Sequence, residues 1–256
     1  MKIRRLFAIL TTVFILSCSS RDKQDKDRTD KYVNIKTFDT TIYFAGTWLS
    51  EDYFNSINKF KSPKLGQDGS SFITIPDRTL KKTMMIENFH EGGSSLTVLK
   101  NKEKYQIWEL QEDSIVGLTA DIEIISETKI KIGDKIFIKI NPSSSDDYFK
   151  ILEEILFKGI YTDYNGKNIE FKNNGEVVGL DKFHYYRPLD DYFDSGSQVD
   201  QISLSTIEKD YNWFGFKFNY DTLEIYKLNC LQMDTINNDC VIVENGELKY
   251  KLWRKK

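Results

Sequence analysis

The chain has two histidines, and each stands close to carboxylates. His90 precedes Glu91 in Asn-Phe-His-Glu-Gly-Gly, where the glycines indicate a tight turn at the end of a strand. An imidazole beside a carboxylate can perform general acid–base catalysis because it titrates near neutral pH. Adjacent residues of an extended strand point to opposite faces, so the simpler interpretation is a histidine that holds the turn by hydrogen bonds. A hydrolase or isomerase using His90 and Glu91 is therefore the weakest of three functional hypotheses.

The second histidine lies in an aromatic segment, Phe-His-Tyr-Tyr-Arg-Pro-Leu-Asp-Asp-Tyr, over residues 183–192. His184, Tyr186 and Arg187 are candidate ligand-binding residues, because an aromatic pocket with a guanidinium can bind a carboxylated or sugar-like ligand. The alternative interpretation places the aromatic rings in the core and pairs Arg187 with one of the two aspartates that follow.

Metal and cofactor sites are not indicated. The acidic runs lack the alternating oxygen ligands of a calcium loop, and no phosphate-binding loop, nucleophile elbow, CxxC or HExxH motif occurs. The net charge of −3 falls to about −6 if the basic N-terminal residues Lys2, Arg4 and Arg5 are removed. A mildly acidic chain argues against nucleic acid as a partner. We therefore predict no cofactor and no bound metal.

The N-terminus has the order of an export signal: basic residues, an apolar stretch from Leu6 to Leu16, a small residue and a cysteine. As a helix this stretch is roughly 17 Å long, well short of the ~30 Å hydrocarbon core, so we interpret it as a signal rather than a membrane span. Ile15-Leu16-Ser17-Cys18 resembles the bacterial lipobox. The resemblance implies a signal peptide over residues 1–17 and lipid attachment at Cys18.

The residues that follow Cys18 predict a lipidated flexible tether over 18–38. From Ser19 to Asp30 no apolar side chain is available to offset the entropy of ordering. Enterobacterial lipoproteins with an Asp after the cysteine stay at the inner membrane, and Ser19 in that place favours the outer membrane by resemblance. We expect a cell-envelope protein that is held to a membrane by its N-terminal acyl chains, such as palmitate.

Cys230 and Cys240 flank a polar, turn-like stretch from Asp234 to Asp239 between two alternating apolar runs. A hairpin centred there would bring the two cysteines together across its strands. The oxidising envelope permits a disulfide bond between them, and metal binding is disfavoured without nearby histidines.

Short alternating runs with polar turns dominate the rest of the chain and predict a mainly β fold built as an antiparallel meander. The clearest runs are 129–132, 136–140, 201–205, 214–220, 223–228 and 246–253. Ser50 to Phe60 and Asp146 to Phe157 instead carry apolar residues at helical spacing, and Ser50 is placed to cap the first helix.

A weak internal repeat divides the fold into two halves. Phe44-Ala-Gly46-Thr-Trp48 and Phe157-Lys-Gly159-Ile-Tyr161 share the order aromatic, any, glycine, any, aromatic. The stretch Asn-Pro-Ser-Ser-Ser-Asp that begins at residue 141 reads as a linker. We predict β domains over residues 39–142 and 146–256, with short helices after the first strand and at the junction.

The Gly46-x-Trp48 opening of a strand meander resembles the first motif of the lipocalin superfamily. The resemblance implies an up-and-down barrel whose tryptophan plugs the closed end, while the other end admits a small apolar ligand. A basic residue near the end of the last strand often covers that tryptophan, and Arg254 would do so if one barrel used both chain ends.

The leading functional hypothesis is a membrane-anchored lipoprotein that binds a small apolar ligand inside such a barrel. The alternative is a structural or protein-interaction module of the envelope whose barrels are filled with side chains. The candidate ligand-binding residues are Trp48, Tyr105, Trp108, His184, Tyr186, Arg187, Phe214 and Phe216.

Overall fold

The structure is a computed structural model of the chain, and it describes residues 40–67, 71–88, 92–112, 114–140, 149–192, 197–207, 210–234 and 239–255. Cys18 and the tether, His90 and Glu91, and the expected domain boundary near residues 143–145 lie outside these ranges. Residues Lys36–Lys256 group into one compact unit.

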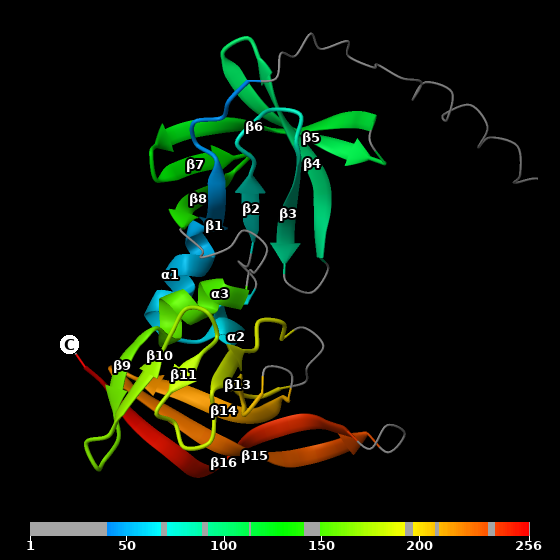
Figure 1. Ribbon diagram of the computed structural model, residues 1–256. Coiled ribbons are helices and arrows are strands. Elements are labelled where there is room, and N and C mark those ends of the chain that lie inside the picture. Colours follow the sequence, from blue (N-terminus) through cyan, green and yellow to red (C-terminus); the bar gives the residue numbers. More distant parts are fainter. Residues whose placement is uncertain are drawn as a thin grey trace, which may run out of the picture. The chain divides into compact units, whose positions relative to one another are not determined.

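The first sheet is a closed antiparallel barrel, which can be followed from blue to green in Figure 1. Each strand pairs with its sequence neighbour, and β1 closes the barrel on β8. The strands are β1 (Gly46–Ser50), β2 (Phe72–Ile75), β3 (Lys82–Asn88), β4 (Gly92–Asn101), β5 (Lys104–Gln111), β6 (Ser114–Ser126), β7 (Lys129–Ile132) and β8 (Lys135–Ile140).

The register around β1 decides which side chains face the interior of this barrel. Trp48 lies opposite Ile73 of β2 and Lys139 of β8. Side chains alternate along a strand, so these three share the inner face, while Leu49 and its partner Ile138 point outward. The buried core of the barrel consists of Ile42, Phe44, Trp48, Ile73, Ile75, Leu96, Val98, Tyr105, Ile107, Ile122, Ile130, Ile132 and Phe137.

The second sheet repeats this plan with one break. Its first strand, β9, pairs with its last, β16, and all consecutive strands pair except β11 and β12. The strands are β9 (Gly159–Thr162), β10 (Asn168–Phe171), β11 (Val177–Val178), β12 (Tyr185–Pro188), β13 (Asp200–Ser205), β14 (Asn212–Asn219), β15 (Thr222–Asp234) and β16 (Asp239–Arg254).

Backbone hydrogen bonds nearly close the second sheet across that break. The Val177 N–H donates to the His184 carbonyl at 2.8 Å, and the Tyr186 N–H donates to the Gly175 carbonyl at 2.7 Å. The described residues therefore form two barrel-like antiparallel meanders in tandem. The predicted mainly β, lipocalin-like fold class is confirmed.

The helices occupy the two places where the sequence predicts them. Helix α1 (Glu51–Phe60) follows β1, and Ser50 stands at its N-cap position, although the Ser50 side chain makes no capping hydrogen bond. Helix α2 (Pro63–Gly66) follows directly, and Ser62 caps it by accepting the Leu65 N–H at 3.1 Å. At the junction, α3 (Phe149–Leu152) continues into a π-helical turn, η2 (Glu153–Phe157).

The apolar face of α1 does not point into the first barrel. Its fully buried residues Tyr53 and Ile57 belong to a core cluster that also contains Leu49 from the outer face of β1. The same cluster contains Leu156 of η2 and the inner residues of the second sheet, such as Phe216. The connection between β1 and β2 is thus packed against the second barrel.

Candidate functional site

The two opening motifs adopt the same local geometry. Gly46 has φ +132° and Gly159 has φ +148°, a backbone conformation that side-chain-bearing residues rarely adopt. A Cβ atom on Gly46 would lie 3.0 Å from Lys139 Cε, and one on Gly159 would lie 3.6 Å from Arg254 Nε. In each barrel the glycine leaves room for a cationic side chain from the last strand.

The aromatic residue of each motif bonds back to the residue four positions earlier. Trp48 Nε1 donates to the Phe44 carbonyl at 3.1 Å, and Tyr161 OH donates to the Phe157 carbonyl at 2.9 Å. Both aromatic side chains are fully buried. The repeated spacing seen in the sequence therefore corresponds to a repeated three-dimensional arrangement.

A cation covers each of these aromatic rings. Lys139 Nζ lies 5.4 Å from the Trp48 ring, and the Arg254 guanidinium lies 5.2 Å from the Tyr161 ring. Arg254 also donates from Nε to Tyr161 OH at 3.0 Å and from its Nη2 to the Leu156 carbonyl. Arg254 was expected to cover Trp48 only if one barrel used both chain ends, and this condition is not met, because β8 closes the first barrel and β16 pairs with β9 in the second.

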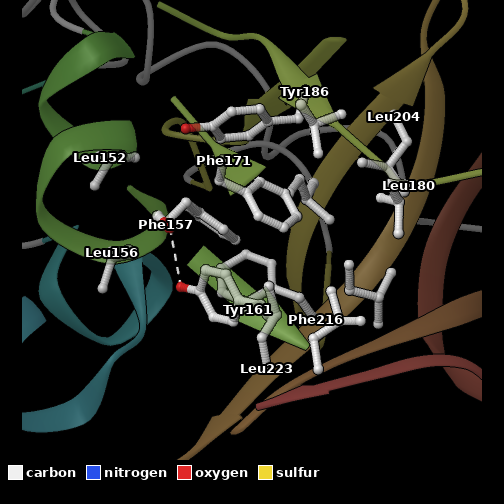
Figure 2. Packing of buried hydrophobic residues seen from close by; sticks show 14 of the residues in the cluster. Leu152, Leu156, Phe157, Tyr161, Phe171, Leu180, Tyr186, Leu204, Phe216 and Leu223 are labelled. Carbon is white, nitrogen blue, oxygen red and sulfur yellow. Dashed lines mark hydrogen bonds between the residues drawn. The ribbon is translucent and has the colours of Figure 1, made fainter. Parts of the chain in front are cut away.

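The interior of the second barrel is occupied by its own aromatic rings. Figure 2 shows Phe157 between Phe171 and Tyr186 on one side and Tyr161 and Phe216 on the other. Its ring centroid lies 5.0 Å from that of Phe216, 5.6 Å from that of Tyr186 and 6.0 Å from that of Phe171. Phe157, which opens the second motif, thus fills the space in which the lipocalin-like barrel was expected to hold a small apolar ligand.

The predicted ligand-binding residues are divided between the two cores. Trp48 and Tyr105 lie in the core of the first barrel, whereas Phe216 lies in that of the second, with Phe214 packed against it. Trp108 lies opposite Thr97 of β4. Its side chain is on the other face of the sheet from Ile107 and Val98, because neighbouring side chains on a strand point to opposite faces. These side chains do not line a common cavity.

The residues of the second predicted cluster also point in different directions. Tyr186 is buried and donates its hydroxyl to the Lys172 carbonyl at 2.5 Å, whereas His184 is exposed. The Arg187 guanidinium lies 6.0 Å from the ring of Tyr211. It also lowers the pKa of Asp190, although burial dominates and raises that pKa to about 6. His90 and Glu91 lie outside the described residues, so their role stays a prediction.

The predicted disulfide between Cys230 and Cys240 is confirmed. The Cα atoms are 5.7 Å apart, and the bond joins β15 to β16. The cysteines are not directly opposite each other, because Cys230 pairs with Val243 and Cys240 with Met233. Register shifts on either side of Gln232 bring the two sulfurs together diagonally.

A concavity with a volume of about 370 Å³ lies where the α1–α2 connection meets the second sheet. We call it the elbow pocket. It is lined by Phe60, Lys61, Ser62, Lys64, Leu65, Gln198, Val199, Asp200, Phe216, Lys217, Phe218 and Asn245. Phe60 and Leu65 at its edge are 47% and 66% exposed, while Phe216 is buried.

Asp200 of β13 holds the α1–α2 connection to the second sheet. Its Oδ1 accepts the Lys64 N–H at 3.0 Å, and its carboxylate also accepts a hydrogen bond from the Ser62 side chain. Burial raises the pKa of Asp200, and these two hydrogen bonds oppose that rise. Burial, followed by the carboxylates of Asp190 and Asp200, raises the pKa of the nearby Tyr53 hydroxyl well above its usual value.

A second open concavity of about 390 Å³ on the first barrel differs in chemistry. Its lining residues are Leu118, Thr119, Ala120, Asp121, Glu123, Lys131 and Gly133. Two carboxylates and one leucine make it less suited to an apolar ligand than the elbow pocket. Among the described residues, no group of three or more His, Cys, Asp or Glu side chains is placed to hold a metal ion.

Of the residues that line the elbow pocket, Phe216 is a ligand-binding candidate predicted from the sequence, whereas those of the α1–α2 connection are not. The local signal is present, because Ser62-Pro63 is a capping residue followed by a proline at the first position of a helix. It predicts where α2 begins. It carries no information about which residues at the second sheet, such as Val199, Asp200 and Phe218, complete the pocket.

No protein-family model, curated protein or solved structure matches this chain. Within the described residues, no helix is both long enough and apolar enough to span a bilayer.

Proposed function

We propose that the chain is a lipid-anchored protein of the cell envelope that binds a small apolar ligand in the elbow pocket. The five apolar side chains among its twelve lining residues carry the proposal. Phe60 and Leu65 flank the concavity with much of their surface exposed, and Val199 and Phe218 belong to the same lining. A ligand that covered Phe60 and Leu65 would remove apolar surface from water, at about 25 cal/mol per Å².

The volume supports the same function. Ligand sites usually enclose about 300–1,000 Å³, and the elbow pocket lies at the lower end of that range at about 370 Å³. This position replaces the interior of the second barrel as the expected ligand site, since the Phe157 ring occupies that interior.

Ligand binding is tested with the mature chain from residue 18, carrying Cys18→Ser so that it needs no detergent. Decanoate and decanol are titrated by calorimetry against this protein and against Phe60→Ala/Leu65→Ala. We expect the double variant to bind at least about tenfold more weakly, because each truncation removes roughly 1 kcal/mol of apolar contact.

The matched control is Ile160→Ala/Val178→Ala, which truncates two apolar side chains of the second sheet that are 46% and 50% exposed and lie outside the pocket. It should bind like the parent chain. Equal affinities for the two double variants, or no binding of either compound to the parent, would refute the proposal.

The anchor is tested separately in bacteria that lipidate their own lipoproteins. Radiolabelled palmitate should be incorporated into the wild-type chain and into Ser17→Ala, which keeps a small residue before the cysteine. It should not label Cys18→Ser. Labelling of the Cys18→Ser variant would show that the lipid is attached at another residue.

A second candidate function, a protein-interaction module of the envelope, is favoured by one surface feature. Tyr211, directly before β14, and Trp213 in β14 stack with ring centroids 6.3 Å apart and are 47% and 39% exposed, with Arg187 beside Tyr211. Trp, Tyr and Arg are the residue types enriched at interface hot spots. Cross-linking in cells should capture a partner with the wild-type chain but not with Trp213→Ala. Identical cross-linked products for the wild-type chain and the variant would exclude this surface as the binding site of the partner.

A further inference from the structure

Three lysines distinguish the elbow pocket from a purely apolar site. Lys61, Lys64 and Lys217 belong to its lining, and Asp200 is the only carboxylate among the lining residues. The pocket therefore has an excess of two positive charges, although the whole chain carries −3. This local excess is opposite in sign to the net charge of the molecule.

The single carboxylate is already engaged by the elbow itself. Asp200 accepts the backbone N–H of Lys64 and the hydroxyl of Ser62, which leaves it directed at the start of α2. Within the part of the chain that the structure describes, neither Lys64 nor Lys217 forms an ion pair. Neither ammonium group is therefore held in a close ion pair, although Lys64 attracts the Asp200 carboxylate and Lys217 attracts the Glu224 carboxylate over longer distances.

The acid that lies across the strands from Lys217 is also committed to other partners. Glu224 lies opposite Lys217 on the neighbouring strand, but its carboxylate accepts from Lys251 Nζ at 2.8 Å and from Tyr226 OH at 2.7 Å. These contacts hold the pKa of Glu224 below its usual value. The carboxylate of Glu224 is thus shared with other donors rather than dedicated to Lys217.

Lys61 lies near one positive and one negative side chain, Arg254 and Asp221. Its Nζ donates a hydrogen bond to the Asn58 side-chain oxygen at 3.5 Å. Partial burial and the positive charge of Arg254 lower the pKa of Lys61, and the negative charge of Asp221 opposes them. An anion bound beside Lys61 would offset both effects.

We propose that the ligand of the elbow pocket is an anionic amphiphile, whose apolar tail contacts Phe60 and Leu65 and whose head group pairs with Lys64 and Lys217. This assignment rests on the proposed function, because it specifies the ligand of the same site. The shared chemistry is an apolar chain with one acidic group, which could come from a free fatty acid or from the head group of an acidic lipid.

Three probes of equal chain length separate the head group from the tail. Decanoate, decanol and decyltrimethylammonium are titrated calorimetrically, below their micellar concentrations, against the mature Cys18→Ser chain. We expect decanoate to bind about tenfold more tightly than decanol and decyltrimethylammonium to bind most weakly. Two exposed charge pairs of up to about 1 kcal/mol each produce an effect of this size.

Charge variants locate the effect. Lys64→Gln/Lys217→Gln should lose the preference for decanoate and keep the affinity for decanol. The matched control, Lys135→Gln/Lys167→Gln, removes two exposed lysines outside the pocket and should keep the preference. Loss of the preference in both double variants would show a general charge effect and overturn the proposal.

The outcomes separate the head group from the function on which it rests. Equal affinities of decanoate and decanol for the parent chain would refute the anionic head group and leave the apolar site standing. Binding of none of the three probes would refute both.

Vesicles identify the source of the acidic group. Cosedimentation with phosphatidylglycerol but not phosphatidylcholine vesicles, lost in Lys64→Gln/Lys217→Gln, would assign a lipid head group. Decanoate binding without cosedimentation would assign a free acid.

Discussion

Replacing Phe157 with alanine would empty the centre of the second barrel. The side chain is completely buried, and its ring lies between 5.0 and 6.0 Å from the rings of Phe171, Tyr186, Phe216 and Phe218. Truncation of a buried phenylalanine costs about 3–5 kcal/mol of unfolding free energy, depending on how far the site can collapse.

The surroundings of Phe157 resist such a collapse. The Lys158 N–H donates to the Glu153 carbonyl, and Arg254 holds the Leu156 carbonyl, so the turn that carries the ring is tied at both ends. We therefore expect the unfolding free energy to fall by about 4 kcal/mol, in the middle of that range. The control Tyr164→Ala, which truncates a residue 83% exposed on the same barrel, should change the free energy by less than about 0.5 kcal/mol.

The assay is urea unfolding of the mature Cys18→Ser chain, followed by circular dichroism and by tryptophan fluorescence. A cavity left by the ring should also bind benzene, so benzene should stabilise Phe157→Ala and leave the parent unaffected. A loss below about 1.5 kcal/mol at an unchanged urea dependence, with no effect of benzene, would refute the claim that this side chain fills the barrel.

Three further predictions concern the closed end, a buried acid and the disulfide. Arg254→Met should lower the unfolding free energy by about 2–3 kcal/mol, because it removes the charged donor to Tyr161 OH and to the Leu156 carbonyl, whereas Lys255→Met should have little effect in the same urea titration. Asp190 has a pKa raised from 3.8 to about 6 by burial, so the folded state binds its proton more tightly than the unfolded state. Its contribution to stability should therefore fall by up to about 3 kcal/mol as the pH rises from about 4 to above 6, and unfolding measured across this range should show a smaller decline in Asp190→Asn. Cys230→Ser/Cys240→Ser should speed amide hydrogen exchange in residues 228–234 and 239–245, since β15 beyond Lys227 pairs only with β16, while exchange in the first barrel stays unchanged; faster exchange around Trp48 would contradict a local role for the bond.

The sequence determined the features of this protein that depend on neighbouring residues. Alternation of apolar and polar side chains predicted the strands, because a strand with one buried face repeats every second residue. The turn between two such runs predicted the hairpin and the Cys230–Cys240 bond. The shared spacing of Phe44 to Trp48 and of Phe157 to Tyr161 anticipated two barrels, and each motif forms the same hydrogen bond over four residues.

Only the tertiary structure decided which distant elements meet. The sequence permitted one barrel closed by both chain ends, and the pairing of β1 with β8 and of β9 with β16 assigned Lys139 to Trp48 and Arg254 to Tyr161. The elbow pocket depends on Asp200 accepting a hydrogen bond from Lys64, which is 136 residues away. No local pattern encodes such a contact, because it results from which surfaces pack once each sheet has closed on itself.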